Sequence, residues 1–279
     1  MNYLDGKPVA ESILNEARAI SEKLKRPPKL AFLRVGENEA DVWYENAAAK
    51  VLKKAGIMSE SVVLKANVRE RPFLSALRKL NRDETVDGIL ILMPLPETVS
   101  VRRVSETIDP EKDMDGISVE NMAALYSGQP GIRPCTAEAV VSLLDYYGID
   151  IRGKRAVVVG RSPVVGRPVA SLLIARDATV TVCHSKTADL TAVSKSADIL
   201  VSAVGKPRFL TQKDVKTGAV VVDVGTSAGE DGKLCGDVDE ADVKAKVSWL
   251  SGVVGGVGTV TTAILALHTA KAAEKRQEP

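Results

Sequence analysis

The sequence has few of the residues on which several classes of protein depend. Its 279 residues include three cysteines, Cys135, Cys183 and Cys235, and two histidines, His184 and His268. The cysteines are far apart and odd in number, so we expect neither a disulfide framework nor a metal site, and a reducing compartment fits. Aromatic residues make up only 4%, which leaves few side chains on which nucleic-acid bases could stack.

Neither an excess of one charge nor a long apolar run is present. The 38 basic residues balance 36 acidic ones, for a net charge of +2, so there is no electrostatic reason to expect nucleic acid or an anionic membrane as a partner. The longest apolar stretch, Gly88 to Leu95, is too short to span a bilayer. The segment Met1 to Lys7 lacks the basic start and apolar core of a signal peptide. We therefore expect a cytoplasmic protein.

Apolar residues make up 45% of the chain, and their patterning alternates between strand and helix. The length suffices for one large or two medium domains. In the first half, helical spacing and buried β-branched runs predict helices and strands in turn, which is typical of a parallel sheet with both faces covered. The expected helices are 8–25, 42–55, 73–80 and 101–107, and the expected strands are 30–35, 62–64 and 87–93.

The second half alternates again, after a helix that Thr136 is expected to cap and that ends near Tyr147. This alternation indicates a Rossmann-like, doubly wound parallel sheet that binds a nucleotide. A final helix is expected to begin at Thr259. The expected strands are 157–159, 179–182, 198–203 and 219–224, and the expected helices are 169–175 and 190–195.

The stretch Val157 to Pro168 reads as a strand, a glycine turn and the start of a helix. Its spacing is G-x-S-x-x-x-G-x-P, with Gly160 and Gly166 as the glycines and Ser162 where a second glycine usually stands. A turn of this kind presents backbone N–H groups at the positive end of a helix, which suits a phosphate. The alternative is an ordinary buried strand followed by a tight turn.

The side chains near this turn favour NADP over NAD. NAD-selective sites usually place an acidic residue after the second strand to bind the ribose hydroxyl, but here that place holds Cys183-His-Ser-Lys186. Arginine, serine and lysine suit the 2′-phosphate of NADP, because its oxygens accept charge-assisted hydrogen bonds. The alternative is that Arg161 and Lys186 are solvated surface charges.

Several segments together resemble the methylenetetrahydrofolate dehydrogenase/cyclohydrolase family, over nearly the whole chain. Each segment alone is a weak signal, but chance is a poor explanation for all of them in this order. They are Lys112-Asp-Met-Asp-Gly116, Arg133-Pro-Cys-Thr136, Gly160 to Pro168, Thr179 to Thr187, Ala203 to Pro207, Asp223-Val-Gly225, Gly236-Asp-Val238 and Gly255-Gly-Val-Gly258.

The resemblance implies two α/β domains that flank a cleft, and a homodimer formed through the cofactor domain. Residues 1–136 with 259–279 would form the folate-binding catalytic domain, and 137–258 the NADP-binding domain. The implied substrate is a reduced folate. A hydride passes from 5,10-methylenetetrahydrofolate to NADP, and a cyclohydrolase step then hydrolyses the methenyl product to 10-formyltetrahydrofolate.

The resemblance also assigns site residues. Tyr44 matches a family tyrosine, and Asp115 matches the pterin-binding aspartate, whose carboxylate can accept paired hydrogen bonds from a pterin. Without the resemblance, Tyr44 could be a half-buried core aromatic and Asp115 a turn residue before Gly116. The implied substrate contacts are Tyr44, Asp115, Gly256 and Val257, and the implied cofactor contacts are Gly160, Arg161, Ser162, Val165, Gly166, Ser185 and, near the nicotinamide, Thr226. His184 is expected to support the site from a strand end rather than to transfer protons.

The chain departs from the family pattern at two catalytic positions. The family's lysine should stand four residues after Tyr44, where this chain has Ala48, and its glutamine should stand where this chain has Leu92. Lys50 is near in sequence, but two further residues rotate it by about 200° around a helix. Prolines of the family pattern are also replaced at Gly252, Val254 and Thr259, and Ala137 and Ala139 follow Thr136.

These departures affect the two reactions differently. Hydride transfer needs the two reactants held in position, whereas hydrolysis needs a positioned acid–base group. We therefore expect dehydrogenase activity with weak or absent cyclohydrolase activity. Two alternatives remain open: a bifunctional enzyme in which Lys50, Lys53 or another group moves into place, and a non-catalytic relic that binds folate or nucleotide.

Overall fold

The structure is a computed structural model that describes residues 1–228 and 234–277, so residues 229–233 and 278–279 of the two expected domains lie outside the described residues. Its contacts divide the chain into two compact units. The six-stranded unit consists of Met1–Ala10 and Thr136–Thr261. The three-stranded unit consists of Glu11–Cys135 and the described chain from Thr262 onward.

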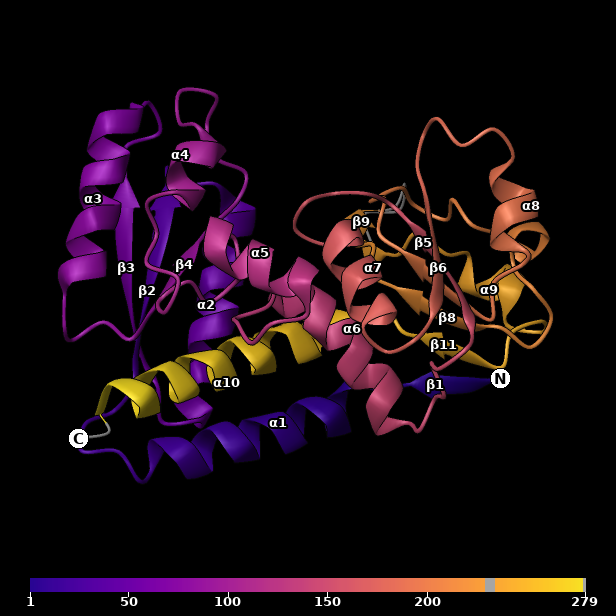
Figure 1. Cartoon of the computed structure of the whole chain (residues 1–279), viewed down its shortest axis with the longest axis horizontal. Helices are drawn as coiled ribbons and strands as arrows, with labels where there is room; N and C mark the ends of the chain where they lie inside the picture. Colours follow the sequence, from indigo (N-terminus) through magenta and orange to yellow (C-terminus); the bar gives the residue numbers. More distant parts are fainter. Residues whose placement is uncertain (229–233, 278–279) are drawn as a thin grey trace. The chain divides into compact units, whose positions relative to one another are not determined.

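The six-stranded unit has a parallel sheet with strand order β1-β11-β8-β7-β5-β6. All residues of β7 and β8 are buried, as are four of the five in β5, which fits β-branched strands covered on both faces. Figure 1 shows α6, α7, α8 and α9 around this sheet. The elements are β1 (Asn2–Leu4), α6 (Cys135–Tyr146), β5 (Arg155–Val159), α7 (Gly166–Ile174), β6 (Thr179–Cys183), α8 (Leu190–Ser194), β7 (Ile199–Ser202), a 3-10 turn η1 (Gln212–Asp214), β8 (Val220–Asp223), β9 (Ser227–Ala228), β10 (Leu234–Cys235), α9 (Glu240–Val243) and β11 (Trp249–Ser251).

The first residues of the chain belong to this sheet, although the sequence analysis assigned them to the other domain. Asn2 to Leu4 pair in parallel with Trp249 to Ser251. Leu4 is fully buried, whereas Asn2 and Tyr3 are exposed. Neither three-residue strand was predicted, because three residues are too few to show the alternation of apolar and polar side chains that marks a strand. Each of the two strands is placed in the sheet by pairing with the other, from the opposite end of the sequence.

The three-stranded unit has a parallel sheet with order β3-β2-β4. Helix α3 covers it with a buried face of Phe73, Leu74, Leu77 and Leu80, which packs in one core with residues of β2 and β4. The elements are α1 (Gly6–Ser21), β2 (Lys29–Val35), α2 (Glu39–Lys54), β3 (Met58–Leu64), α3 (Glu70–Arg82), β4 (Gly88–Ile91), α4 (Val101–Ser105), α5 (Val119–Ser127) and α10 (Val257–Gln277). Both α1 and α10 contribute residues to both units.

Several helix ends differ from those expected. Helix α6 begins at Cys135, so Thr136 lies inside the helix rather than at its cap. Helix α10 begins at Val257, two residues before the expected cap Thr259. Helix α2 begins earlier than predicted because the side chain of Asn38 accepts a hydrogen bond from the N–H of Ala40. Among the described residues, no helix combines the length and apolar character needed to cross a membrane.

Candidate functional site

The turn between β5 and α7 is packed so closely that it requires glycine at two positions. Gly160 has φ of 124°, and a Cβ there would lie 2.3 Å from the carbonyl oxygen of Ala203. A Cβ on Gly166 would lie 2.2 Å from the carbonyl oxygen of Gly160. The Ser162 Oγ accepts hydrogen bonds from the N–H groups of Val165 (3.1 Å) and Gly166 (3.3 Å). The Ser162 hydroxyl thus holds the turn that leads into α7, whose N-cap residue is Val165. The tight backbone fits a phosphate-binding turn.

The end of the neighbouring strand β6 presents polar side chains beside this turn. Val159 of β5 pairs with Cys183 of β6, so the carboxyl ends of the two strands meet. The His184 Nδ1 accepts a hydrogen bond from the N–H of Lys186 (3.1 Å), which shapes the turn. Ser185, Lys186 and Arg161 are exposed. A serine and two basic side chains are thus exposed after the ends of β5 and β6, and no carboxylate stands between positions 183 and 188.

Two buried carboxylates that the sequence analysis missed fix the loops after β7 and β8. Asp223 accepts hydrogen bonds from the N–H groups of Gly225, Asp237 and Val238. Burial raises the pKa of Asp223 to about 6. Asp237 accepts hydrogen bonds from the hydroxyl of Ser202 and from the N–H groups of Val204 and Lys206.

This packing also explains two glycines. A Cβ on Gly225 or Gly236 would lie within 2.1 Å of one of these carboxylates. The motifs Asp223-Val-Gly225 and Gly236-Asp-Val238 were the available signal in the sequence. Thr226, a predicted nicotinamide contact, follows Gly225 and is exposed.

In the three-stranded unit, the segment Lys112 to Gly116 positions Asp115. The Nζ of Lys112 is buried and donates to the carbonyls of Leu80 (3.2 Å), Asn81 (2.8 Å) and Asp83 (2.7 Å) at the end of α3. Asp113 accepts hydrogen bonds from residues at the start of α5, and Met114 is buried beneath β4. Gly116 has φ of 62°, and a Cβ there would lie 2.7 Å from the carbonyl oxygen of Ile132. Asp115 is half-buried, whereas Lys112, Asp113 and Met114 are buried, so Asp115 is the carboxylate of this segment that solvent or a ligand can reach.

We expect Lys112→Met to lower the free energy of unfolding by about 3 kcal/mol, because three carbonyls, one buried and two partly buried, lose their charged donor. Burial, together with repulsion from Arg276, already lowers the pKa of Lys112. Urea unfolding monitored by circular dichroism measures the change. The control is Lys79→Met, an exposed lysine on α3. Equal unfolding midpoints for the two variants would contradict this role for Lys112.

Asp115 lies among side chains from three helices. Its Oδ1 accepts a hydrogen bond from the N–H of Cys135 at 2.9 Å. The carbonyl of Met114 accepts one from the Sγ of Cys135 and lies 3.1 Å from the Nδ1 of His268. Burial raises the pKa of Asp115 to about 6; the hydrogen bond from Cys135 and the charge of His268 oppose this rise, and the charge of Asp113 adds to it. The sequence analysis did not place Cys135 or His268 in the site.

Tyr44 faces the same cluster. Burial, together with smaller electrostatic effects of Cys135 and Asp115, raises the pKa of the Tyr44 hydroxyl above its ordinary value, so the phenol is neutral. The electrostatic effect of Asp115 on the Tyr44 hydroxyl indicates that the two side chains are near each other. Their shared role in binding a substrate stays a prediction.

The two positions at which the sequence analysis expects family residues to be replaced hold apolar side chains. Ala48, one turn after Tyr44 on α2, is 1% exposed, and Leu92, directly after β4, is half-buried. Lys50 and Lys53 are exposed. Neither lysine shares the buried environment of Ala48.

The predicted substrate contacts Gly256 and Val257 belong to the six-stranded unit. A Cβ on Gly256 would lie 2.0 Å from the carbonyl oxygen of Gly252, and Val257 is 3% exposed. The side chain of Val257 is therefore part of the core. A contact with substrate at these residues would have to use the backbone.

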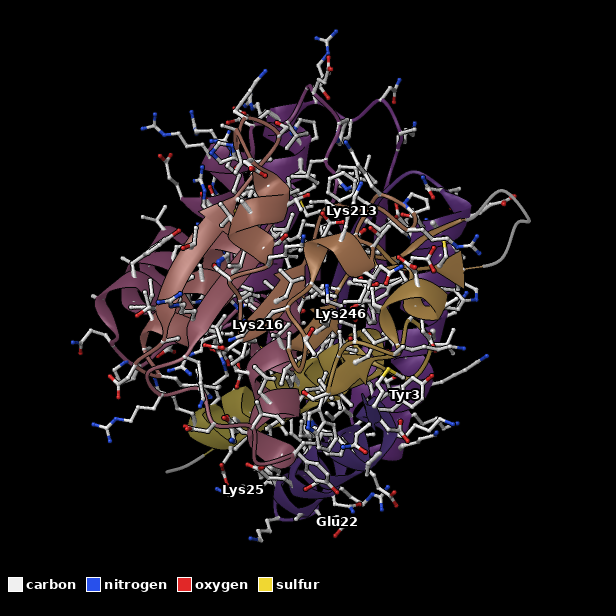
Figure 2. The ribbon with its side chains drawn as sticks, turned by 90° about the vertical axis from the view of Figure 1, so that its right-hand side faces the viewer. Tyr3, Glu22, Lys25, Lys213, Lys216 and Lys246 are labelled. Atoms are coloured by element: carbon white, nitrogen blue, oxygen red, sulfur yellow. The ribbon has the colours of Figure 1, made fainter. Side chains whose placement is uncertain are left out.

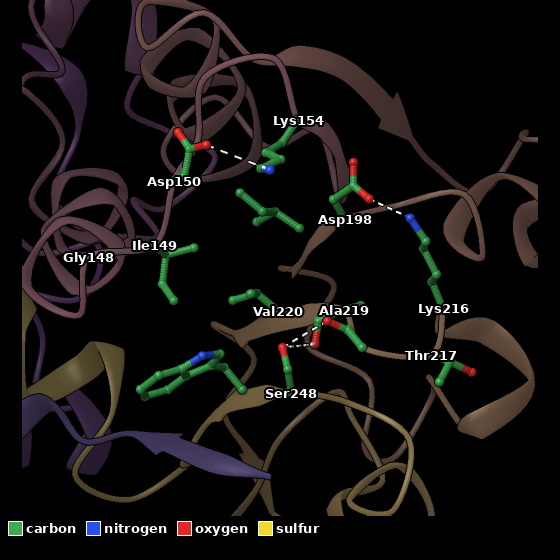
Figure 3. Close-up of a pocket in the computed structure, with 13 residues that line it drawn as sticks. Gly148, Ile149, Asp150, Lys154, Asp198, Lys216, Thr217, Ala219, Val220 and Ser248 are labelled. Atoms are coloured by element: carbon green, nitrogen blue, oxygen red, sulfur yellow. Dashed lines mark hydrogen bonds and ion pairs between the residues drawn. The ribbon is translucent and has the colours of Figure 1, made fainter.

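A separate hollow lies at the amino ends of the parallel strands β5, β7, β8 and β11 (Figure 3). Its charged side chains are paired, since Lys154 contacts Asp150 (3.6 Å) and Lys216 contacts Asp198 (2.5 Å). Figure 2 labels Lys213, Lys216 and Lys246 on the face that it shows, and the Nζ of Lys246 donates to the carbonyl of Gln212. The hollow lies at the opposite end of these strands from the Gly160 turn. Within residues 1–228 and 234–277, no group of three or more His, Cys, Asp or Glu side chains could hold a metal.

Two family models together match most of the chain. A model described as the tetrahydrofolate dehydrogenase/cyclohydrolase catalytic domain matches residues 4–115. A model described as the NAD(P)-binding domain of the same family matches residues 134–277. The second range contains the glycine turn and both buried carboxylates.

Individual relatives match over nearly their whole length. The chain is 45% identical to a protein named bifunctional protein FolD from Methanoculleus marisnigri, over 98% of this chain and 96% of that protein. The bifunctional enzyme FolD of Campylobacter jejuni has a similar structure, with a TM-score of 0.96, 39% identity and 99% of each chain covered. The enzyme of Trypanosoma brucei, solved with NADP cofactor and inhibitor, has a TM-score of 0.90 at 35% identity, over 98% of this chain and 96% of that one.

Proposed function

The chain belongs to the tetrahydrofolate dehydrogenase/cyclohydrolase family, and we propose that it oxidises 5,10-methylenetetrahydrofolate to 5,10-methenyltetrahydrofolate with NADP. The observation that supports this proposal most is the close-packed turn between β5 and α7, where Gly160 and Gly166 leave no room for a side chain. In the three-stranded unit, the electrostatic effect of Asp115 on Tyr44 supports a folate site that uses both residues.

The six-stranded unit would bind the cofactor. NADP supplies the nicotinamide ring that accepts the hydride. The turn from Gly160 to Gly166 would hold phosphate at the start of α7, and Arg161, Ser185 and Lys186 would bind the 2′-phosphate. Thr226 would lie on the nicotinamide side. A homodimer formed through this unit is part of the same proposal, and analytical ultracentrifugation would test it.

Arg161→Gln should weaken NADP binding about tenfold and leave NAD binding nearly unchanged, because only NADP carries the 2′-phosphate. Titration of both cofactors by isothermal calorimetry measures this. Arg152→Gln, which removes an exposed arginine that contacts Asp177 at 3.5 Å, is the control. An equal loss for both cofactors in Arg161→Gln would contradict the assignment.

The three-stranded unit would bind the folate. Asp115 would accept hydrogen bonds from the amino and ring N–H groups of the pterin, and Tyr44 would pack and donate beside it. Hydride departure needs no protein acid or base, because the neighbouring folate nitrogens delocalise the positive charge. The residues of this unit need only hold the carbon at near-attack distance.

Hydrolysis of the methenyl product makes a different demand. Water must add to a cation, and protons must be moved by a positioned group. The positions from which the family supplies lysine and glutamine hold the buried Ala48 and the half-buried Leu92. We infer that the cyclohydrolase step is weak or absent.

The second candidate is a fully bifunctional enzyme that produces 10-formyltetrahydrofolate. The names of the relatives at 42–45% identity favour it, because they are called bifunctional. In such an enzyme, a group other than a lysine at position 48 would act as the acid–base catalyst of hydrolysis. The exposure of Lys50 and Lys53 gives it no support from the described conformation.

One assay separates these candidates. Purified protein is mixed with methylenetetrahydrofolate and NADP, and methenyl absorbance is followed. The proposal expects the product to form and then to decay at the uncatalysed rate. Accelerated decay would establish the bifunctional candidate, and absence of product would support a non-catalytic relic. Repeating the assay with NAD measures cofactor choice.

A further inference from the structure

The carboxylate of Asp237 is buried in the six-stranded unit and collects three hydrogen bonds from one short loop. Its Oδ2 accepts from the hydroxyl of Ser202 (2.9 Å) and from the N–H of Val204 (2.7 Å). Its Oδ1 accepts from the N–H of Lys206 (2.8 Å). The side chain is 0% exposed. The loop after β7 is therefore held on both sides of Ala203.

Ala203 is the residue against which the glycine turn packs. Its N–H donates to the carbonyl of Val159, the last residue of β5 (2.8 Å). A Cβ on the next residue, Gly160, would lie 2.3 Å from the carbonyl oxygen of Ala203. The two loops meet through backbone atoms, so no side chain can adjust between them. A shift of the loop that Asp237 holds would displace the turn that begins at Gly160.

The same residue is joined to the loop after β8 through Asp223. The N–H of Asp237 donates to the Oδ1 of Asp223 (3.1 Å), and this oxygen also accepts from the N–H of Gly225 (2.9 Å). A Cβ on Gly225 would lie 2.1 Å from the Oδ1 of Asp237. Gly225 directly precedes Thr226, the proposed contact on the nicotinamide side. Asp237 thus packs against both loops that the cofactor would need.

We propose that Asp237 is a positioning residue for the cofactor, because it holds the glycine turn, through Ala203, and the loop of Thr226, through Asp223, in one fixed arrangement. The inference rests on the proposed function, since it assigns the role through cofactor binding. The buried side chain acts through the backbone of these loops and not by contact with the cofactor. Both the phosphate end and the nicotinamide end of the site depend on it.

Asp237→Asn tests this role with little change in size. One carboxylate oxygen is replaced by an NH2 group, which cannot accept a hydrogen bond, so at least one of the three donors loses its acceptor. Calorimetric titration should show that NADP and NAD both bind about tenfold more weakly, by the same factor. The backbone position that changes is common to the two cofactors, whereas the 2′-phosphate contact stays. In turnover, KM for NADP should rise and KM for methylenetetrahydrofolate should stay close to the wild-type value.

Asp214→Asn is the matched control in the same unit. Asp214 is also buried, and its carboxylate accepts from the hydroxyl of Thr191 (2.6 Å) and from the N–H and hydroxyl of Thr211 (both 3.0 Å). It holds the 3-10 turn η1 instead of a cofactor loop. Urea unfolding should show that both variants lose stability, whereas Asp214→Asn should keep wild-type affinity for both cofactors.

Ser202→Ala is a milder variant that removes one of the three donors to Asp237 and leaves the carboxylate in place. It should weaken both cofactors equally, by about threefold, and it decides the question if Asp237→Asn does not fold. Wild-type affinity in the folded Asp237→Asn or in Ser202→Ala would overturn the inference, as would a loss confined to NADP or an equal loss in Asp214→Asn. These results leave the dehydrogenase proposal intact, whereas a wild-type protein that binds neither cofactor would contradict the proposed function itself.

Discussion

Ala48→Lys combined with Leu92→Gln should raise the rate of methenyltetrahydrofolate hydrolysis by about a hundredfold or more, the range typical of a positioned acid–base group. Position 48 lies one turn after Tyr44 and is 1% exposed. An ammonium group introduced there would be buried, and burial lowers the pKa of lysine toward neutrality. A lysine with that pKa can both accept and donate a proton at physiological pH.

The matched control is Ala48→Met with Leu92→Gln, which adds a side chain of similar length without the ammonium group. The decay of methenyl absorbance is compared for the wild type and both double variants, after circular dichroism has verified folding. Dehydrogenase rates should change much less than hydrolysis rates. If the methionine variant hydrolysed as fast as the lysine variant, or if the wild type were already as fast, our account of the two positions would fail.

Gly166→Ala should weaken NADP binding by about a hundredfold or more. The new Cβ would lie 2.2 Å from the carbonyl oxygen of Gly160 and 2.9 Å from the N–H nitrogen of Arg161. Both atoms are backbone, so the turn cannot accommodate the methyl group by moving a side chain. Relief requires a shift of the turn that is expected to hold the phosphate, and electrostatic contacts of this kind depend on position.

Gly258→Ala is the control for this substitution, because a Cβ there meets nothing within 4 Å and the residue lies in helix α10. Calorimetric titration with NADP compares the two variants, and folate binding tests whether Gly166→Ala has spared the other unit. Wild-type NADP affinity in Gly166→Ala would show that the turn does not hold the cofactor in the way we describe.

Much of the fold could be predicted because the spacing of apolar residues and the strand or helix preference of those residues indicate the same elements. The runs at Leu30 to Val35 and Val157 to Val159 lie in buried parallel strands, and the helix predicted over 73–80 has its apolar residues on the sheet. The strands β1 and β11 could not be predicted, since each has three residues and depends on its partner for a place in the sheet.

The candidate site could be predicted only in part. Tyr44 and Asp115 could be named from their motifs, and in the structure Asp115 has an electrostatic effect on the Tyr44 hydroxyl. His268 carried none, because its neighbours Ile264 and Leu267 indicate only a helix face packed in a core. Asp223 and Asp237 belong to motifs that the sequence analysis recognised. Their structural role, which the motifs did not reveal, is to accept hydrogen bonds from residues distant in sequence. Such roles depend on tertiary contacts, which no local pattern encodes.

The pairing of β1 with β11 has a consequence for the order of events during biosynthesis. Asn2 to Leu4 leave the ribosome long before Trp249 to Ser251, and all of Glu11 to Cys135 is translated in between. Strand β1 therefore has no partner strand until most of the chain has been synthesised. Contacts between residues so distant in sequence also form slowly. A nascent chain stalled before β11 would expose β1 and β8 as open sheet edges. Limited proteolysis of ribosome-bound chains of increasing length would reveal the step at which the sheet closes.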